Sequence, residues 1–168
     1  GDDVNPFASD GYGPFDSQPG RESWNGLVTS SNTNDLRGKI LRIKVREDGG
    51  YDIPEGNLFP DNHNGKARPE IYVMGNRKPY RISVDKRTGY LYWGEVGPDA
   101  SNDSETRGPR GYDEVNQARK AGYFGSPLFV GNNFAYNRYD FATKTSGPRF
   151  DPLKPVNEAP QNTGLVNL

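Results

Sequence analysis

Residues 80–96 read Tyr-Arg-Ile-Ser-Val-Asp-Lys-Arg-Thr-Gly-Tyr-Leu-Tyr-Trp-Gly-Glu-Val, and this stretch decides the fold class. Tyr80, Ile82 and Val84 alternate with polar residues, which is the period of a strand with one buried face. Residues 85–89 are polar and end in glycine, the usual composition of a hairpin turn. Residues 90–96 return with Leu91 and Trp93 on one face. The stretch therefore predicts an antiparallel hairpin.

Two further segments carry a strand pattern. Residues 39–45 read Lys-Ile-Leu-Arg-Ile-Lys-Val, and they predict one half-buried strand with Leu41, Ile43 and Val45 on its inner face. Residues 70–74 predict another short strand. With the hairpin, these segments make most of a four-stranded antiparallel arrangement.

The remaining segments are less regular. Residues 1–35 are rich in Gly, Pro, Asn, Asp and Ser but contain aromatics, and they predict a long ordered loop. Residues 97–116 predict a polar, acidic loop, and residues 115–121 allow one helical turn. Short extended pieces are expected near residues 128–130 and 136–141. No helix longer than two turns is expected.

The composition also indicates short strands joined by tight turns. The chain has 21 glycines, 14 prolines and no cysteine among its 168 residues. Glycine and proline together make about a fifth of the chain, against an average usage of roughly 12%. Several short strands with Gly/Pro turns predict an all-β sandwich or propeller. Mean hydropathy is −0.94, low for a domain that closes its own core.

Charge and hydropathy limit the possible partners. The formal net charge is −1, whereas binding to nucleic acid or to an anionic membrane surface relies on a basic surplus. The longest apolar runs are only a few residues, too short to span a membrane. His63 is the one histidine, so neither a Ser-His-Asp triad nor a histidine-rich zinc site is expected.

The acidic loop over residues 97–116 is the best candidate for binding chemistry. Carboxylates and turn carbonyls are hard oxygen donors of the kind that calcium prefers. The spacing does not match an EF-hand, and on pattern alone a solvated acidic loop is the favoured interpretation over a metal site. The carboxylates of the loop are those of Asp99, Asp103, Glu105, Asp113 and Glu114.

The chain contains an ordered series of short motifs. They are Asn-Asp-Leu-Arg-Gly-Lys-Ile-Leu-Arg-Ile (34–43), Ile-Pro-Glu-Gly-Asn-Leu-Phe (53–59), Glu-Ile-Tyr-Val-Met-Gly-Asn-Arg-Lys-Pro (70–79), residues 85–89, Gly-Pro (97–98), Asp-Glu-Val-Asn (113–116) and Gly-Tyr-Phe-Gly-Ser-Pro (122–127). This series resembles the glucose/sorbosone dehydrogenase family, whose members use pyrroloquinoline quinone (PQQ) and calcium on a six-bladed β-propeller. The resemblance implies an all-β fold, part of such a propeller with long loops.

The resemblance implies a cofactor site with both a cationic and a carbonyl part. Arg77 matches the family's arginine that contacts the quinone, a role suited to a guanidinium that donates several hydrogen bonds. Lys78 stands where the family usually has an asparagine near the quinone. Gly97 and Pro98 match the pair whose backbone carbonyls hold the cofactor's calcium.

Two further implications concern metal and catalysis. Asp113 and Glu114 match an acidic pair at a second, structural calcium site. The family's histidine base matches a position upstream of Gly1, and further basic cofactor contacts match positions downstream of Leu168. We therefore expect no catalytic residue within residues 1–168, which we interpret as an internal fragment of a propeller domain. The sequence Gly-Tyr-Phe-Gly-Ser-Pro departs from the family's usual Gly-Asn-Tyr-Gly-Trp-Pro.

Two functions follow as expectations. The first is a segment of a PQQ- and calcium-dependent dehydrogenase that transfers hydride from a sugar or sugar aldehyde to the quinone. The second is a non-catalytic, calcium-stabilised propeller module that binds carbohydrate or protein within a larger extracellular protein. Either would be secreted, periplasmic or at the cell surface, with a bacterial source expected. Its partner would be the rest of the propeller or another chain, packed on apolar faces that carry Leu41, Ile43, Ile82 and Trp93.

Overall fold

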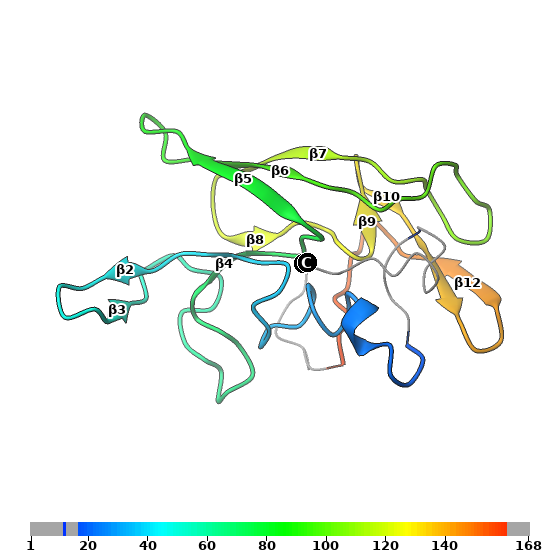
Figure 1. Cartoon of the computed structure of the whole chain (residues 1–168), viewed down its shortest axis with the longest axis horizontal. Coiled ribbons are helices and arrows are strands. Elements are labelled where there is room, and N and C mark those ends of the chain that lie inside the picture. Colours follow the sequence, from blue (N-terminus) through cyan, green and yellow to red (C-terminus); the bar gives the residue numbers. More distant parts are fainter. Residues whose placement is uncertain (1–11, 13–16, 161–168) are drawn as a thin grey trace.

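The computed structural model describes residue 12 and residues 17–160. Within them the chain is all-β: twelve short strands are joined by loops, and the single helical element is the 3₁₀ turn η1 (Glu22–Trp24). Figure 1 shows the strands in chain order. They are β1 (Ile40–Leu41), β2 (Lys44–Val45), β3 (Tyr51–Asp52), β4 (Ile71–Met74), β5 (Pro79–Val84), β6 (Leu91–Glu95), β7 (Glu114–Ala118), β8 (Gly122–Tyr123), β9 (Phe129–Val130), β10 (Phe134–Ala135), β11 (Asn137–Asp140) and β12 (Thr145–Arg149).

The predicted hairpin supplies two strands of a three-stranded sheet with the order β5-β6-β7, whereas β1 and β4 belong to another sheet, so the four predicted strands do not form one four-stranded sheet. Val84 pairs with Leu91, and the two strands are joined by the turn over residues 85–89. Asp85 stabilises this turn, because its carboxylate accepts hydrogen bonds from the Arg87 amide at 3.0 Å and the Thr88 hydroxyl at 2.6 Å. Gly89 has a φ of +73°, which glycine adopts without strain. The predicted hairpin is confirmed.

We expect Asp85→Ala to lower the free energy of unfolding, because the turn loses two hydrogen bonds that solvent only partly replaces. Urea denaturation of the wild type and the variant measures this difference. Glu47→Ala, which removes an exposed carboxylate from the turn after β2, is a control for the loss of a surface charge. An effect of Asp85→Ala no larger than that of a neutral surface substitution would show that the carboxylate does not hold the turn.

The segment 39–45 differs from its prediction as one continuous strand. It forms β1, which pairs with β4, and β2, which pairs with β3 in another sheet. Residues 42–43 separate the two parts, and a register irregularity lies within β1, between Ile40 and Leu41. Ile40 is buried, whereas Leu41, Ile43 and Val45 are exposed, so the predicted inner face was wrong. The irregularity changes which residues face inward, and alternation alone does not reveal it.

The segment 115–121 does not form a helical turn either. Most of it belongs to β7, which pairs in antiparallel register with β6 from Glu114 to Ala118. The open edge of β6 supplies hydrogen-bond partners along this whole segment, so tertiary pairing overrides a weak local preference. Gln117 reinforces the pairing by donating a hydrogen bond to the Tyr92 hydroxyl at 2.6 Å.

Two sheets pack face to face and enclose one of the hydrophobic clusters of the chain. The second sheet has the order β1-β4-β8, and it lies beneath β5-β6-β7 in Figure 1. The shared cluster of buried side chains comprises Ile40, Val73, Leu91, Trp93 and Ala118. Face-to-face packing of small sheets is how neighbouring blades of a propeller meet, so the arrangement fits part of a β-propeller. The all-β prediction is confirmed.

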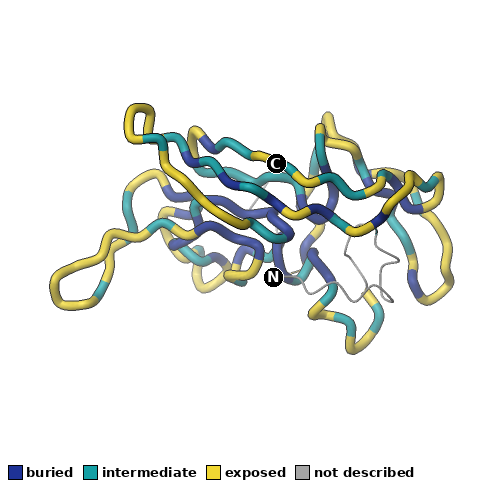
Figure 2. The backbone as a smooth tube through the Cα atoms, turned by 45° about the horizontal axis from the view of Figure 1, so that its top comes forward, coloured by how far each residue is buried: buried dark blue, intermediate teal, exposed yellow. Residues whose placement is uncertain are grey.

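Exposed apolar residues remain outside this core. Figure 2 shows buried segments in the middle of the molecule and exposed ones along β5 and the β2–β3 hairpin. Ile82 is 59% exposed, whereas its cross-strand partner Trp93 is 1% exposed. Trp93 is covered by Ile40 and Val73 of the second sheet and by Phe124, whose ring meets it edge-on at a centroid distance of 4.8 Å. The expectation of bare faces therefore holds for Leu41, Ile43 and Ile82, but it was wrong for Trp93.

The long loop predicted over residues 1–35 lies partly outside the described residues. Its described part, residues 17–35, contains only η1 as a regular element. The loop is nevertheless packed, because Thr29, Ser30 and Thr33 are fully buried. The two extended pieces predicted near residues 128–130 and 136–141 are present as β9 and β11.

Candidate cofactor and metal site

Arg77 lies where the loop after β4 meets the end of β6, and its side chain is only 3% exposed. Its backbone N–H donates to a carboxylate oxygen of Glu95 at 2.5 Å. Its guanidinium donates to the Val96 carbonyl at 3.1 Å and lies 3.6 Å from the carboxylate of Asp99. Contacts to both its backbone and its side chain thus hold Arg77 in one position.

Glu95 is a buried carboxyl group that the sequence analysis did not single out. Burial is the main cause that raises the pKa of Glu95 to about 7, and the nearby charge of Glu114 also raises this pKa. The hydrogen bonds from the Arg77 amide and the Trp93 indole, and the charge of Arg77, act in the opposite direction and lower it. Glu114 is the direct cross-strand partner of Glu95 between β7 and β6. The signal was available, because Glu95 continues the inward series of Leu91 and Trp93.

Gly97 and Pro98 lie at a close crossing of two loop segments. The Gly97 N–H donates to the Asp113 carboxylate at 2.9 Å. A Cβ at Gly97 would lie 2.0 Å from the Tyr112 carbonyl oxygen, and a Cβ at Gly111 would lie 1.5 Å from the Pro98 oxygen. Only glycine permits backbones to approach this closely. The crossing therefore fixes the positions of the Gly97 and Pro98 carbonyl groups.

Asp113 and Glu114 contact different segments of the chain. Glu114 accepts the Gly131 amide at 2.5 Å with one oxygen and the Asn116 side chain at 3.1 Å with the other, while Asp113 is exposed and holds Gly97. In the part of the chain that the structure describes, no three His, Cys, Asp or Glu side chains are grouped as metal ligands. A metal here would therefore need backbone carbonyl ligands as well.

A small cleft brings four of the six predicted residues together: Arg77, Gly97, Pro98 and Glu114 line it. Tyr136 lines the same cleft and was missed by the sequence analysis, because an aromatic in a predicted strand reads as a core residue. Its hydroxyl is buried, and among residues 12 and 17–160 it finds no hydrogen-bond partner. Burial is the main cause that raises the pKa of Tyr136.

A second, more open cleft is lined by cations. Arg37, Lys39, Arg77 and Lys78 all contribute to its wall, together with Tyr80. Lys78 thus joins Arg77 at this cleft, whereas Asp113 lines neither of the two. Arg77 lies on the wall of both clefts and connects the cationic one to the one with oxygen donors.

The residues present fit the chemistry of the implied groups. PQQ carries carboxylates, and the cationic cleft offers the Arg77 guanidinium and the Lys78 ammonium as complementary groups. Calcium binds hard oxygens in irregular geometry, and the small cleft supplies the Gly97 and Pro98 backbone and the Glu114 carboxylate.

The sequence profile of the family "Glucose / Sorbosone dehydrogenase" matches residues 21–165. The chain therefore belongs to the glucose/sorbosone dehydrogenase family, and the resemblance noted from its motifs is confirmed.

Individual relatives include two proteins of Arabidopsis thaliana. The chain is 28% identical to the HIPL1 protein over 163 residues, covering 89% of this chain and 22% of HIPL1. It is 30% identical to the HIPL2 protein over 143 residues, covering 77% of this chain and 16% of HIPL2. The chain thus spans less than a quarter of either relative. Since both are plant proteins, the expected bacterial source stays a prediction.

Two solved structures of similar sequence are dehydrogenases. One is a glucose dehydrogenase, 25% identical, with a TM-score of 0.43, and the match covers 60% of this chain and 25% of that one. The other is the soluble aldose sugar dehydrogenase of Escherichia coli in its apo form, 25% identical, with a TM-score of 0.41. That match covers 60% of this chain and 24% of that one.

The described part of the chain contains no helix that is long and apolar enough to cross a membrane.

Proposed function

We propose that this chain supplies part of the cofactor site of a PQQ- and calcium-dependent sugar dehydrogenase. The observation that carries the proposal is the position of Arg77, which lines both the cationic cleft and the cleft with oxygen donors. A cofactor that carries both carboxylates and a metal ion needs these two environments side by side. Membership of the family supports the same assignment.

Arg77 and Lys78 are the proposed contacts to the quinone cofactor. The guanidinium of Arg77 keeps its charge at all relevant pH values, and its planar donors suit a carboxylate or a carbonyl. Its bonds to Val96 and Glu95 orient it before any ligand arrives, which reduces the entropy lost on binding. Lys78 adds a second positive charge on the same side of the cleft.

The Gly97 and Pro98 carbonyls are the proposed ligands of the cofactor's calcium, and Asp113 with Glu114 those of a structural calcium. Calcium at the quinone would act as a Lewis acid, and hydride transfer from the sugar is chemistry of the cofactor. The residues of this chain bind and orient, and we assign none of them as the catalytic base. The sugar or sugar aldehyde, the electron acceptor and the base lie beyond what these residues provide.

Exposed residues of the sheet β5-β6-β7 also support a proposed partner, namely further chain of the same propeller. Tyr80, Ile82, Val84 and Val115 are exposed on β5 and β7. Apolar residues on both faces of one sheet are the pattern of a blade that packs against neighbours. The relatives are several times longer than this chain, so they contain further sequence of the kind needed. Secretion is proposed with this function.

A non-catalytic, calcium-stabilised module is the second candidate function. The specific observation in its favour is that Arg77 is almost fully buried and already contacts Val96 and Asp99. A guanidinium with these contacts can have a purely structural role. Lys78 in place of a neutral side chain points the same way. In this function calcium binding persists, whereas quinone binding is absent.

Calcium and PQQ titrations of the intact protein separate the two functions. We expect calcium at about 100 times its dissociation constant to raise the free energy of unfolding by about 2.7 kcal/mol relative to excess chelator. We expect PQQ to bind in the presence of calcium. Arg77→Ala should weaken this binding at least about tenfold, since it removes a charge-assisted hydrogen bond. Calorimetry and an aldose-dependent dye assay provide the readouts.

The matched control is Arg87→Ala, which removes an exposed guanidinium from the β5–β6 turn. It should leave PQQ affinity unchanged. Calcium stabilisation without PQQ binding would establish the module, and absence of both responses would exclude both functions.

A further inference from the structure

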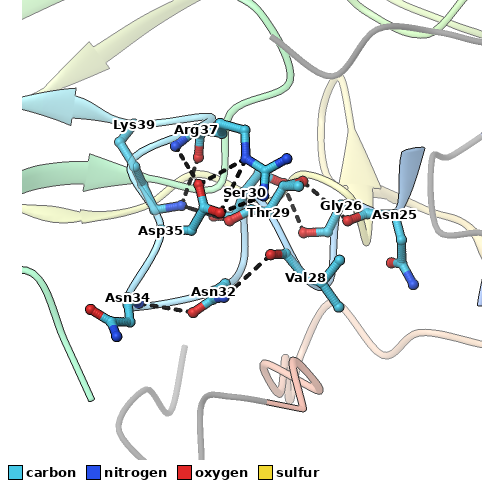
Figure 3. A network of polar contacts seen from close by, with 10 residues as sticks. All are labelled: Asn25, Gly26, Val28, Thr29, Ser30, Asn32, Asn34, Asp35, Arg37 and Lys39. Atoms are coloured by element: carbon cyan, nitrogen blue, oxygen red, sulfur yellow. Dashed lines mark hydrogen bonds and ion pairs between the residues drawn. The ribbon is translucent and has the colours of Figure 1, made fainter. Parts of the chain in front are cut away.

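Lys39 is a buried lysine whose ammonium group is surrounded by backbone carbonyls. It is 8% exposed. It donates to the carbonyl oxygens of Thr29 at 3.0 Å, Ser30 at 2.8 Å and Arg37 at 2.8 Å (Figure 3). An ammonium has three N–H donors, so these bonds match its full donor capacity. Such saturation is what makes burial of a charge tolerable.

The carbonyls belong to a loop without regular secondary structure. Side chains hold its turns: the Thr29 hydroxyl donates to the Asn25 carbonyl and the Ser30 hydroxyl to the Gly26 carbonyl, each at 3.1 Å. Figure 3 shows that the loop folds back on itself, so that residues 29–30 and residue 37 lie beside Lys39. The ammonium joins the part of the loop at residues 29–30 to the part at residue 37. It therefore closes the loop as a bound cation would.

The closed loop contacts the segment that leads to Arg77. The Ser30 carbonyl, which accepts from Lys39, also accepts the Gly75 amide at 3.2 Å. The Gly38 carbonyl, one residue before Lys39, accepts the Asn76 amide at 3.2 Å. Gly38 has a φ of +65°, and a Cβ on it would lie 2.3 Å from the Asn76 oxygen. The loop and this segment thus pack backbone to backbone.

We propose that Lys39 is a positioning residue of the cofactor site, a tethered cation that closes the loop over residues 25–38 onto Gly75 and Asn76 and thereby holds Arg77 in place. The assignment of a ligand to Arg77 rests on the proposed function, whereas the loop closure does not. Glu95 secures Arg77 from the β6 side. Through the loop that it closes, Lys39 secures Gly75 and Asn76, the two residues before Arg77, so two buried ionisable groups contribute to the position of Arg77.

Asp35 does not replace the carbonyls as the partner of Lys39. Partial burial raises its pKa, but the hydrogen bonds from Arg37 and the charges of Arg37 and Lys39 lower it overall. Its carboxylate is engaged by the Arg37 guanidinium at 2.5 Å and by the Arg37 amide at 2.7 Å. The ammonium of Lys39 therefore acts mainly through backbone dipoles, as an ion in a carbonyl cage does.

Amide hydrogen exchange of the intact protein tests the loop closure. In Lys39→Met we expect the Gly75 and Asn76 amides to exchange at least about tenfold faster, while the amides of β6 keep their wild-type rates. Lys44→Met, which replaces an exposed lysine of β2, is the control and should change neither group. Unchanged rates at Gly75 and Asn76 would overturn the proposal, and so would an equal increase throughout the protein.

Chemical rescue provides a second test that a merely structural lysine would not pass. Lys39→Ala leaves the carbonyls facing a vacated space, so millimolar methylammonium should restore protection of the two amides, whereas tetramethylammonium, which has no N–H, should not. Lys39→Gln, which keeps two donors without the charge, should lie between wild type and Lys39→Met. Equal effects of the two ammonium ions would overturn the role of the ammonium as a tethered cation.

The link to ligand binding has its own readout. We expect Lys39→Met to weaken PQQ binding at least about tenfold, with methylammonium rescue in Lys39→Ala restoring it. If PQQ binds equally to wild type and Lys39→Met, the positioning role is overturned. If PQQ does not bind the wild type, the proposed function fails, and the exchange data alone decide whether Lys39 positions Arg77.

Discussion

Replacing Trp93 with alanine is expected to lower the free energy of unfolding by about 3–5 kcal/mol, the usual cost of removing a buried tryptophan. Trp93 is 1% exposed and lies between the two main sheets, in one cluster with Val73 of β4. Its ring meets Phe124 edge-on, and its indole N–H donates to Glu95 at 3.2 Å. Its removal leaves a cavity between the sheets and takes a hydrogen bond from the buried carboxyl group next to Arg77.

Chemical denaturation of the protein measures this loss, and two variants interpret it. Trp93→Phe keeps an aromatic ring near Phe124 but lacks the N–H, so it should cost clearly less than alanine. Tyr80→Ala removes an aromatic that is 62% exposed on the adjacent strand, and its cost should stay below about 1 kcal/mol. Equal losses for Trp93→Ala and Tyr80→Ala would mean that the interface between the sheets does not provide the core.

The hairpin around Trp93 shows why part of the fold was predictable from sequence. Its two strands are consecutive, the turn residues Asp85 and Gly89 fix the register, and alternation then identifies Leu91 and Trp93 as one face. Each of these signals is local. The burial of that face could not be predicted from local sequence, because it depends on contacts with Val73 and Ile40 of another sheet.

The segments that were mispredicted depend on distant pairing. Residues 39–45 have regular alternation, yet β1 and β2 belong to different sheets, and the register irregularity at Ile40 moves the inward position by one residue. β7 exists because β6 offers it an edge. Val84 and Ile82 look like core residues in the sequence but are exposed, since strand alternation does not say whether anything covers the face.

The residues of the candidate site also fall into two groups, those that local motifs identify and those that distant contacts determine. Arg77, Gly97, Pro98 and Glu114 were found because they lie in motifs, and the structure places all four around one cleft. Glu95 and Tyr136 line that cleft although they lie outside the predicted site, and Lys39 lines the cationic cleft. Their importance comes from burial and from contacts with residues far along the chain, which composition and spacing do not encode.

The close approach of Pro98 and Gly111 leads to the second large effect. A Cβ on Gly111 would lie 1.5 Å from the Pro98 carbonyl oxygen and 2.5 Å from its carbonyl carbon. Real atoms do not approach this closely, and backbone atoms cannot rotate away as a side chain does. We therefore expect Gly111→Ala to separate residues 97–98 from residues 111–112, at a cost of about 3 kcal/mol or more in the free energy of unfolding.

Gly122→Ala is the matched control for this substitution, because it adds the same methyl group at another glycine without a positive φ. A Cβ at Gly122 would lie 3.5 Å from Phe124, an ordinary van der Waals contact, so we expect a change below about 1 kcal/mol. Since Gly111→Ala displaces the Pro98 carbonyl directly, it should also reduce the stabilisation by calcium, which Gly122→Ala should preserve. Thermal and chemical denaturation with and without calcium measures both effects. Similar stabilities of the two variants would show that the crossing has room to relax, and a calcium response that survives in Gly111→Ala would place the ion away from the Gly97 and Pro98 carbonyls.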